Sequence, residues 1–157
     1  MLLAPHFVVG AVVASTVPNP ALGLVLAMAS HFVLDQLPHW HYTSEDNALT
    51  RPLNTASAAQ ALAVFLRIAL DVLLGVFLVL LANPASAVFA LAGGVVACLP
   101  DFFLFLGWQL PGSRVLGWWR VMHQAIHIRP ANEPAWPLGV PLQAVMAVGA
   151  ALLLWRV

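Results

Sequence analysis

Five of the six histidines and two of the carboxylates in this strongly apolar chain fall into three short clusters. The first cluster spans residues 31–41 and reads His-Phe-Val-Leu-Asp-Gln-Leu-Pro-His-Trp-His, at the end of an apolar segment. The second is Asp101, inside another apolar segment, and the third is the pair His123 and His127. A charge or an imidazole in a hydrocarbon setting costs several kcal/mol unless it is paired, neutralised or bound to a metal. The pattern therefore predicts one polar, metal-binding site inside a membrane protein.

The spacing within the first cluster favours a shared ion. His31 and Asp35 are four residues apart and therefore share one face of a helix. Zinc binds imidazole nitrogen and carboxylate oxygen at about 2.0–2.2 Å. Pro38 ends the helix and can turn His39, with His41 as an additional ligand, toward the same ion. A His–Asp hydrogen bond that closes the helix end would also account for the first pair, but the two further histidines favour the metal.

The remaining clusters could supply the other ligands. His123 and His127 repeat the four-residue spacing, although two histidines on an apolar helix could also face lipid headgroups. Asp101 needs a nearby cation or hydrogen-bond donor, which is either the metal or an arginine. His6 opens the first apolar segment, and we expect it to complete the ligand set, although a lone histidine there could simply be a polar cap.

A fourth pair of charges lies in a different apolar segment. Arg67 and Asp71 are four residues apart, so an internal ion pair is the first interpretation. Asp71 could instead be a deep metal ligand or the general base. Arg67 and Arg120 are the arginines that could pair with Asp101 if that carboxylate binds no metal.

Composition limits the class of protein. The chain has 157 residues, enough for a single domain over residues 1–157. It is 62% hydrophobic and 8% charged, against roughly 25% charged residues in soluble domains. The net charge is zero and lysine is absent, so we expect no nucleic-acid partner. The single cysteine, Cys98, excludes a disulfide within the chain.

Proline-containing turns divide the sequence into apolar segments, and a membrane-crossing helix needs about 20 mostly apolar residues. We expect apolar helices over residues 3–17, 21–37, 56–81, 85–110 and 137–155, of which the first is short for a crossing. A further helix over about residues 114–128, with Ser113 as its N-cap, mixes tryptophans with polar side chains, which is typical of a membrane surface. The predicted fold is all-α: a polytopic membrane helical bundle of four to five spans with one interfacial amphipathic helix.

The arginines predict an orientation. Five spans place the N-terminus, residues 38–55 and residues 111–136 on one side of the membrane. That side carries four arginines, and the other side carries only Arg156. The four are Arg51, Arg114, Arg120 and Arg129. By the positive-inside rule their side is cytoplasmic. The histidine clusters fall on the same side, so we expect the site to face the cytoplasm.

With these residues the chain resembles the YdjM-like family, small bacterial membrane proteins described as membrane-bound metal-dependent hydrolases. The resemblance lies in His6, in the Ser-His-Phe-Val-Leu-Asp-Gln-Leu-Pro-His-Trp stretch at residues 30–40, in Cys-Leu-Pro-Asp at residues 98–101, and in the late histidine pair. It implies a multi-pass protein of the bacterial inner membrane with a divalent metal cofactor. That family is distantly similar to zinc-dependent phospholipase C and to single-strand nucleases of the same all-α fold, in which a His-x-x-x-Asp pair binds zinc.

We therefore expect a membrane-bound hydrolase that uses a metal-activated water on a phosphoester, either a membrane lipid or a lipid-linked phosphate. One or two zinc ions would be held by His6, His31, Asp35, His39, Asp101, His123 and His127. Asp71 or Asp101 would accept the proton as the catalytic carboxylate. Arg120 and Arg129 are the candidates for holding phosphate oxygens.

Three other functions would use the same polar groups. A metal or proton transporter would use them as a relay that includes Asp71. A haem-binding subunit would use two of the histidines as axial ligands, although the carboxylates fit a harder metal better. A structural or lipid-organising protein would only pair its histidines with carboxylates. Transport in proteoliposomes and a visible spectrum discriminate the first two from a hydrolase.

Overall fold

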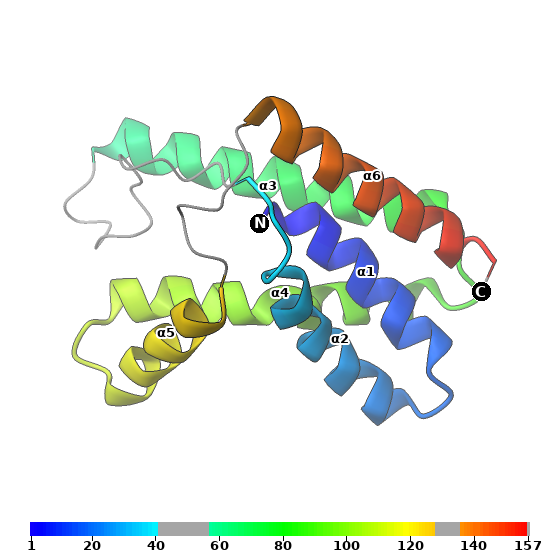
Figure 1. Cartoon of the computed structure of the whole chain (residues 1–157), viewed down its shortest axis with the longest axis horizontal. Coiled ribbons are helices and arrows are strands. Elements are labelled where there is room, and N and C mark those ends of the chain that lie inside the picture. The colour runs from blue at the N-terminus through cyan, green and yellow to red at the C-terminus, as the bar shows by residue number, and fades with distance from the viewer. Residues whose placement is uncertain (41–56, 128–135, 157) are drawn as a thin grey trace.

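The described part of the chain is mainly helical (Figure 1). The computed structural model describes residues 1–40, 57–127 and 136–156, and within these ranges it contains six helices and no strand. The helices are α1 (Leu3–Thr16), α2 (Pro20–Leu34), α3 (Ala58–Leu81), α4 (Ala87–Gln109), α5 (Arg114–Ile126) and α6 (Trp136–Leu154). The predicted all-α fold is confirmed.

Local sequence signals explain where several helices begin. Asn19 accepts a hydrogen bond from the backbone N–H of Leu22 and caps α2, with a proline at the first helical position. Ser57 and Gln60 form a capping box at the start of α3. Ser113 accepts from the backbone at the start of α5, as predicted.

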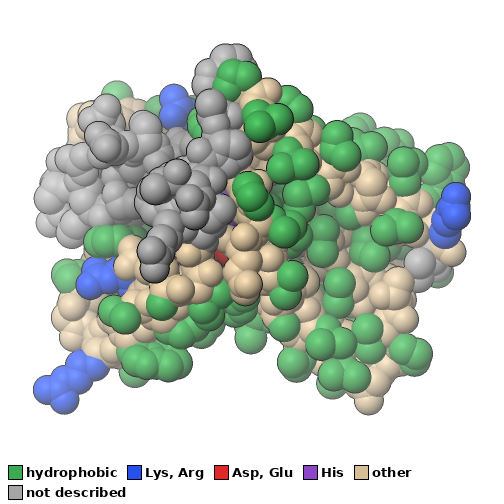
Figure 2. All heavy atoms as spheres, viewed as in Figure 1, with side chains coloured by type: hydrophobic (Ala, Val, Ile, Leu, Met, Phe, Trp, Pro, Cys, Tyr) green, Lys and Arg blue, Asp and Glu red, His purple; other side chains and the backbone are tan. Residues whose placement is uncertain are grey.

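Three of the described helices, α3, α4 and α6, are long and apolar enough to cross a membrane. At about 1.5 Å per residue, α1 and α2, of 14 and 15 residues, are only about 21–23 Å long, less than the roughly 30 Å of a hydrocarbon core. The helix lengths therefore support three candidate spans and do not establish the predicted four to five. Apolar side chains cover much of the surface in Figure 2, as expected for a protein that contacts lipid.

The short helix α1 is the centre of the bundle, and it packs against α2, α3, α4 and α6 (Figure 1). Its crossing with α4 is very close. A β-carbon added to Gly10 would lie 2.3 Å from the β-carbon of Ala97 and 2.7 Å from the carbonyl oxygen of Gly93. Gly94 leaves room in the same way for the ring of Phe7. Small residues thus allow these helices to approach, as they do in membrane proteins generally.

The start of α1 lies beside the middle of α3. Two backbone N–H groups in the first turn, those of Leu3 and Ala4, donate to the carboxylate of Asp71, which is near the midpoint of α3. The turn between α1 and α2, the turn between α3 and α4, and the C-terminus lie together at one end of the molecule (Figure 1). The helices α1 and α2 therefore extend from that end only as far as the interior of the bundle.

Candidate metal centre

Three helices bring four ligand-type side chains together at this interior point. They are His31 on α2, Asp35 directly after α2, Asp101 on α4 and His123 on α5. Each of them offers one nitrogen or oxygen atom, and these four atoms lie within 4.8 Å of one another. We call them the first ligand group. The sequence placed these residues in three separate clusters, and the fold makes them neighbours.

The distances in the first ligand group match those between ligands of one ion. The Nε2 atom of His31 lies 3.1 Å from Oδ2 of Asp35 and 3.6 Å from Oδ1 of Asp101. The Nε2 atom of His123 lies 3.5 Å from each of the same two oxygens and 3.1 Å from Nε2 of His31. Ligands at about 2.1 Å from a tetrahedral ion are about 3.4 Å apart. These contacts come from residues up to 92 positions apart in the chain.

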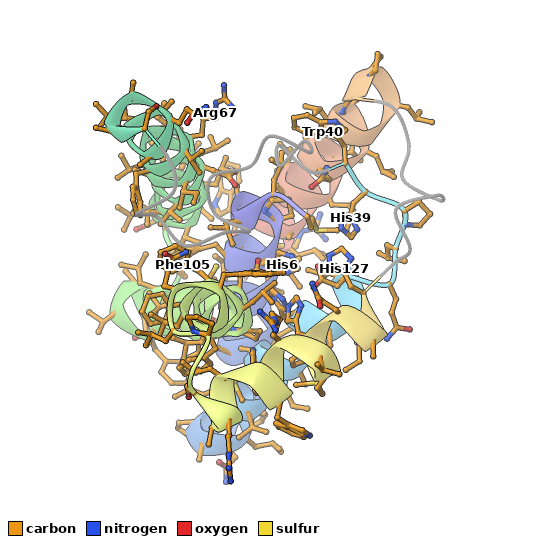
Figure 3. All side chains as sticks on the ribbon, turned by 90° about the vertical axis from the view of Figure 1, so that its left-hand side faces the viewer. His6, His39, Trp40, Arg67, Phe105 and His127 are labelled. Carbon is orange, nitrogen blue, oxygen red and sulfur yellow. The ribbon has the colours of Figure 1, made fainter. Side chains whose placement is uncertain are left out.

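The other oxygen of Asp35 faces a second ligand group. Asp35, His39 and His127 again offer ligand atoms within 4.8 Å of one another. Oδ1 of Asp35 lies 3.6 Å from Nε2 of His127 and 3.2 Å from Nε2 of His6. Figure 3 shows His6, His39 and His127 gathered on one side of the bundle, from α1, the segment after α2 and the end of α5. Asp35 therefore belongs to both groups, with one oxygen in each.

Buried polar atoms without hydrogen bonds indicate that a cation fits here. Both oxygens of Asp35, both ring nitrogens of His6 and Nδ1 of His123 are buried and make no hydrogen bond. The two oxygens nevertheless lie 3.1–3.6 Å from imidazole nitrogens. Leaving a buried carboxylate unsatisfied costs more than leaving a neutral group unsatisfied. A divalent metal would satisfy these atoms, and imidazole and carboxylate are ligands that such ions prefer.

Two of the histidines are held by backbone carbonyls in the orientation of metal ligands. Nδ1 of His31 lies 2.9 Å from the carbonyl oxygen of Ala97, and Nδ1 of His39 lies 2.6 Å from that of Leu37. Because a carbonyl only accepts hydrogen bonds, each Nδ1 carries the proton. Each neutral ring then has its lone pair on Nε2, and His31 directs this atom into the first group. Metal-binding histidines are typically fixed in this way.

The environment of His123 favours its neutral form. Burial lowers the pKa of His123, and the nearby carboxylates of Asp101 and Asp35 raise it only in part, so the pKa lies below the usual 6.5. His123 is therefore neutral near pH 7, and the neutral imidazole is the form that binds a metal.

Asp71 lies outside both ligand groups. Its two oxygens accept the backbone N–H groups of Leu3 and Ala4, so it caps the start of α1 from the neighbouring helix α3. The structure records no ion pair between Asp71 and Arg67, both described residues, and Arg67 lies on the exposed side of α3 (Figure 3). The expected Arg67–Asp71 pair is therefore wrong. The contacts of Asp71 are those of a residue that positions α1.

Of the two arginines predicted to hold phosphate oxygens, Arg120 is the one within the described residues. The guanidinium of Arg120 lies over the ring of Trp108, 4.5 Å from its centre, in a cation–π contact. Oδ1 of Asp101 lies 3.6 Å from Nε2 of His31 and 3.5 Å from Nε2 of His123, and the described residues show no ion pair between Asp101 and Arg67 or Arg120. His41 and Arg129 lie outside the described residues.

One buried polar residue near the site was missed in the sequence. Gln143 on α6 is fully buried and accepts a hydrogen bond from the backbone N–H of Leu2 at 2.7 Å. It donates to the carbonyl oxygens of Trp40 at 2.9 Å and Gly139 at 3.1 Å. The available signal was a single amide in an otherwise apolar helix, since such residues often hold membrane helices together.

Comparison with known proteins found no matching family model, no matching curated protein and no matching solved structure. The site is therefore characterised by its own geometry. That geometry is a buried group of histidines and aspartates, contributed by several helices, that could hold a metal ion.

Proposed function

We propose that the chain is a membrane-embedded, metal-dependent hydrolase of phosphoesters. The observation that carries this proposal is the convergence of His31, Asp35, Asp101 and His123, whose ligand atoms lie within 4.8 Å of one another in the interior of an apolar bundle. The resemblance of these residues to the YdjM-like family supports the reaction class. Among oxygen and nitrogen ligands of this kind, zinc is the ion we expect.

The two ligand groups support two ions that share one carboxylate. The first ion would be held by His31, His123, Asp101 and Oδ2 of Asp35. The second would be held by His39, His127 and Oδ1 of Asp35, with His6 completing the shell. Pairs of metal ions about 3.5–4 Å apart are common in enzymes that cleave phosphoesters.

The protein's own groups define the rest of the mechanism. When bound, the metal would lower the pKa of a water molecule and polarise the phosphoryl oxygen. Asp101 is the best placed proton acceptor, because its side chain is 28% exposed whereas that of Asp35 is 2% exposed. Asp71 is occupied by the backbone of α1 and is not needed in this role. Arg129 is our candidate for holding phosphate oxygens.

The surroundings of the site favour a lipid or a lipid-linked phosphate as substrate. Helix α5 carries His123 and exposes Val115, Trp118 and Val121, which suits a helix at the level of the headgroups. The positive-inside rule would put α5 on the cytoplasmic face, and the resemblance to the YdjM-like family implies a bacterial inner membrane. The helices α3, α4 and α6 would cross the membrane, with α1 and α2 as shorter crossings that bring the total to five.

The other functions considered from the sequence have weaker structural support. A relay through Asp71 would need a carboxylate free to exchange protons, but both of its oxygens accept backbone N–H groups. Bis-histidine ligation of haem needs the two imidazoles on opposite faces of a macrocycle. The Nε2 atoms of His31 and His123 are 3.1 Å apart with carboxylates beside them, which leaves no space for that ring.

Hydrolysis by the purified protein tests the proposal. In mixed micelles we expect zinc-dependent release of a phosphorylated headgroup from a phospholipid, and cleavage of a soluble model phosphodiester at a lower rate. Asp101→Asn should lower the rate by about 100-fold or more, because it removes both a ligand of the first ion and the proposed proton acceptor. Arg156→Gln, an exposed position after α6 and outside both ligand groups, is the control and should be unaffected. Metal-loaded, folded protein that cleaves neither substrate would contradict the proposed reaction.

A further inference from the structure

The buried amide of Gln143 joins two separate segments that carry ligands. Its Oε1 accepts the N–H of Leu2, one turn before His6 in the chain. Its Nε2 donates to the carbonyl of Trp40, the residue that follows His39. Helix α6 itself contributes no ligand to either group.

Gln143 adds a contact from another helix to each of these segments. Residues 38–40 follow the end of α2 and are not helical, and Nδ1 of His39 donates to the carbonyl oxygen of Leu37 within the same segment. At the start of α1, the backbone N–H groups of Leu2, Leu3 and Ala4 have no acceptor within the helix. Gln143 binds the first of them, from Leu2, while Asp71 binds those of Leu3 and Ala4. The positions of His6 and His39 therefore both depend on side chains from other helices.

We propose that Gln143 is a positioning residue for the second ligand group, fixing His39, a member of that group, and His6, whose Nε2 lies 3.2 Å from Oδ1 of Asp35. This inference rests on the proposed function, in which the second group holds a metal ion. The inference also predicts that substitution of Gln143 weakens metal binding by the second ligand group and leaves binding by the first group unchanged. The first group is fixed by other contacts, such as the hydrogen bond from His31 to Ala97, whereas the hydrogen bonds of Gln143 go to Leu2, Trp40 and Gly139, none of which belongs to that group.

The experiment measures zinc binding at each site separately. Protein stripped with a chelator is titrated with Zn²⁺ alone in detergent micelles, in competition with a chromophoric chelator, and bound zinc is counted by mass spectrometry. Wild-type protein is compared with Gln143→Leu, which removes all three hydrogen bonds, and with Gln143→Glu, whose carboxylate cannot donate to Trp40. Met146→Leu, on the same helix, is the control.

We expect two ions on wild-type protein and on Met146→Leu. Both Gln143 variants should bind one ion with wild-type affinity and the second at least tenfold more weakly, the size of effect seen when a group that orients a metal ligand is removed. Equal weakening of both sites would show a general structural role and overturn the inference, as would two unchanged sites. If wild-type protein binds only one ion, the inference about Gln143 is overturned, but the proposed hydrolase function with a single metal ion still stands. If wild-type protein binds no ion, the proposed function is contradicted as well.

Discussion

Asp35 is the residue on which the site depends most. Its carboxylate is buried and makes no hydrogen bond, and five histidines surround it, from α1, α2, α5 and the residues that follow α2 and α5. Spacing in the sequence pairs Asp35 with His31 because both lie on one turn of a helix. The contribution of His6 and His123 could not be derived from spacing, since it depends on how α1 and α5 pack.

The shared position of Asp35 leads to a prediction about metal content. Asp35→Asn should lose both ions, because the neutral amide is a poor ligand and the variant weakens both groups at once. Asp101→Asn should lose only the ion of the first group. Bound zinc per folded protein, measured by mass spectrometry after size-exclusion chromatography, checks both variants. Equal zinc content in the two variants would contradict the shared carboxylate.

At the scale of elements, the sequence predicted the helices well. Every predicted apolar helix begins and ends within three residues of the observed one, because prolines and polar caps mark the boundaries. In the sequence, the adjacent glycines at 93 and 94 indicate that another helix can approach α4 closely. That these glycines face Gly10 and Phe7 is a tertiary contact, which no local pattern specifies.

The crossing of α1 and α4 predicts opposite effects for two glycine substitutions. Gly10→Ala places a methyl group 2.3 Å from Ala97 and against the backbone of Gly93, so we expect a loss of about 1–3 kcal/mol from overpacking. Gly149→Ala, on α6 with no atom within 4 Å of the added carbon, should be neutral or stabilising by up to about 1 kcal/mol. Thermal unfolding in detergent measures the difference. A Gly10→Ala variant as stable as Gly149→Ala would refute this packing.

Helix α5 should be held in place by the metal. It packs mainly against α4, yet its His123 and the following His127 reach the ligand groups. Removing the metal removes that link, so amide hydrogen exchange in α5 should speed up by about tenfold or more, while exchange in the central helix α1 changes less. Exchange is followed by mass spectrometry with and without a chelator. Uniform acceleration along the chain would instead indicate global destabilisation.

At the scale of the whole molecule, the structure places the site deeper than the sequence suggested. The sequence analysis predicted that the ligands lie near the ends of the spans on the side expected to be cytoplasmic. In the structure, α1 begins beside Asp71, near the middle of α3, so the ligands lie within the bundle. This depth follows from the shortness of α1 and α2 together with their packing, and only the shortness is visible in the sequence.

Labelling of single cysteines tests the proposed orientation. In a Cys98→Ala background, Ala21→Cys lies in the first turn of α2, next to the connection with α1, and Gly112→Cys lies between α4 and α5; both positions are exposed. A membrane-impermeant maleimide added to intact cells whose outer membrane has been permeabilised should label Ala21→Cys. It should label Gly112→Cys only after the inner membrane is opened. The reverse pattern would place α5 and the site on the opposite face.

The central claim is that imidazoles and carboxylates from distant helices bind one metal centre. X-ray absorption at the zinc edge of purified protein tests it directly. We predict a shell of nitrogen and oxygen ligands at about 2.0–2.2 Å with outer scattering from imidazole, lost in His31→Ala/His123→Ala. Folded protein that retains no zinc when supplied with it, or a shell containing the sulfur of Cys98, would contradict the account.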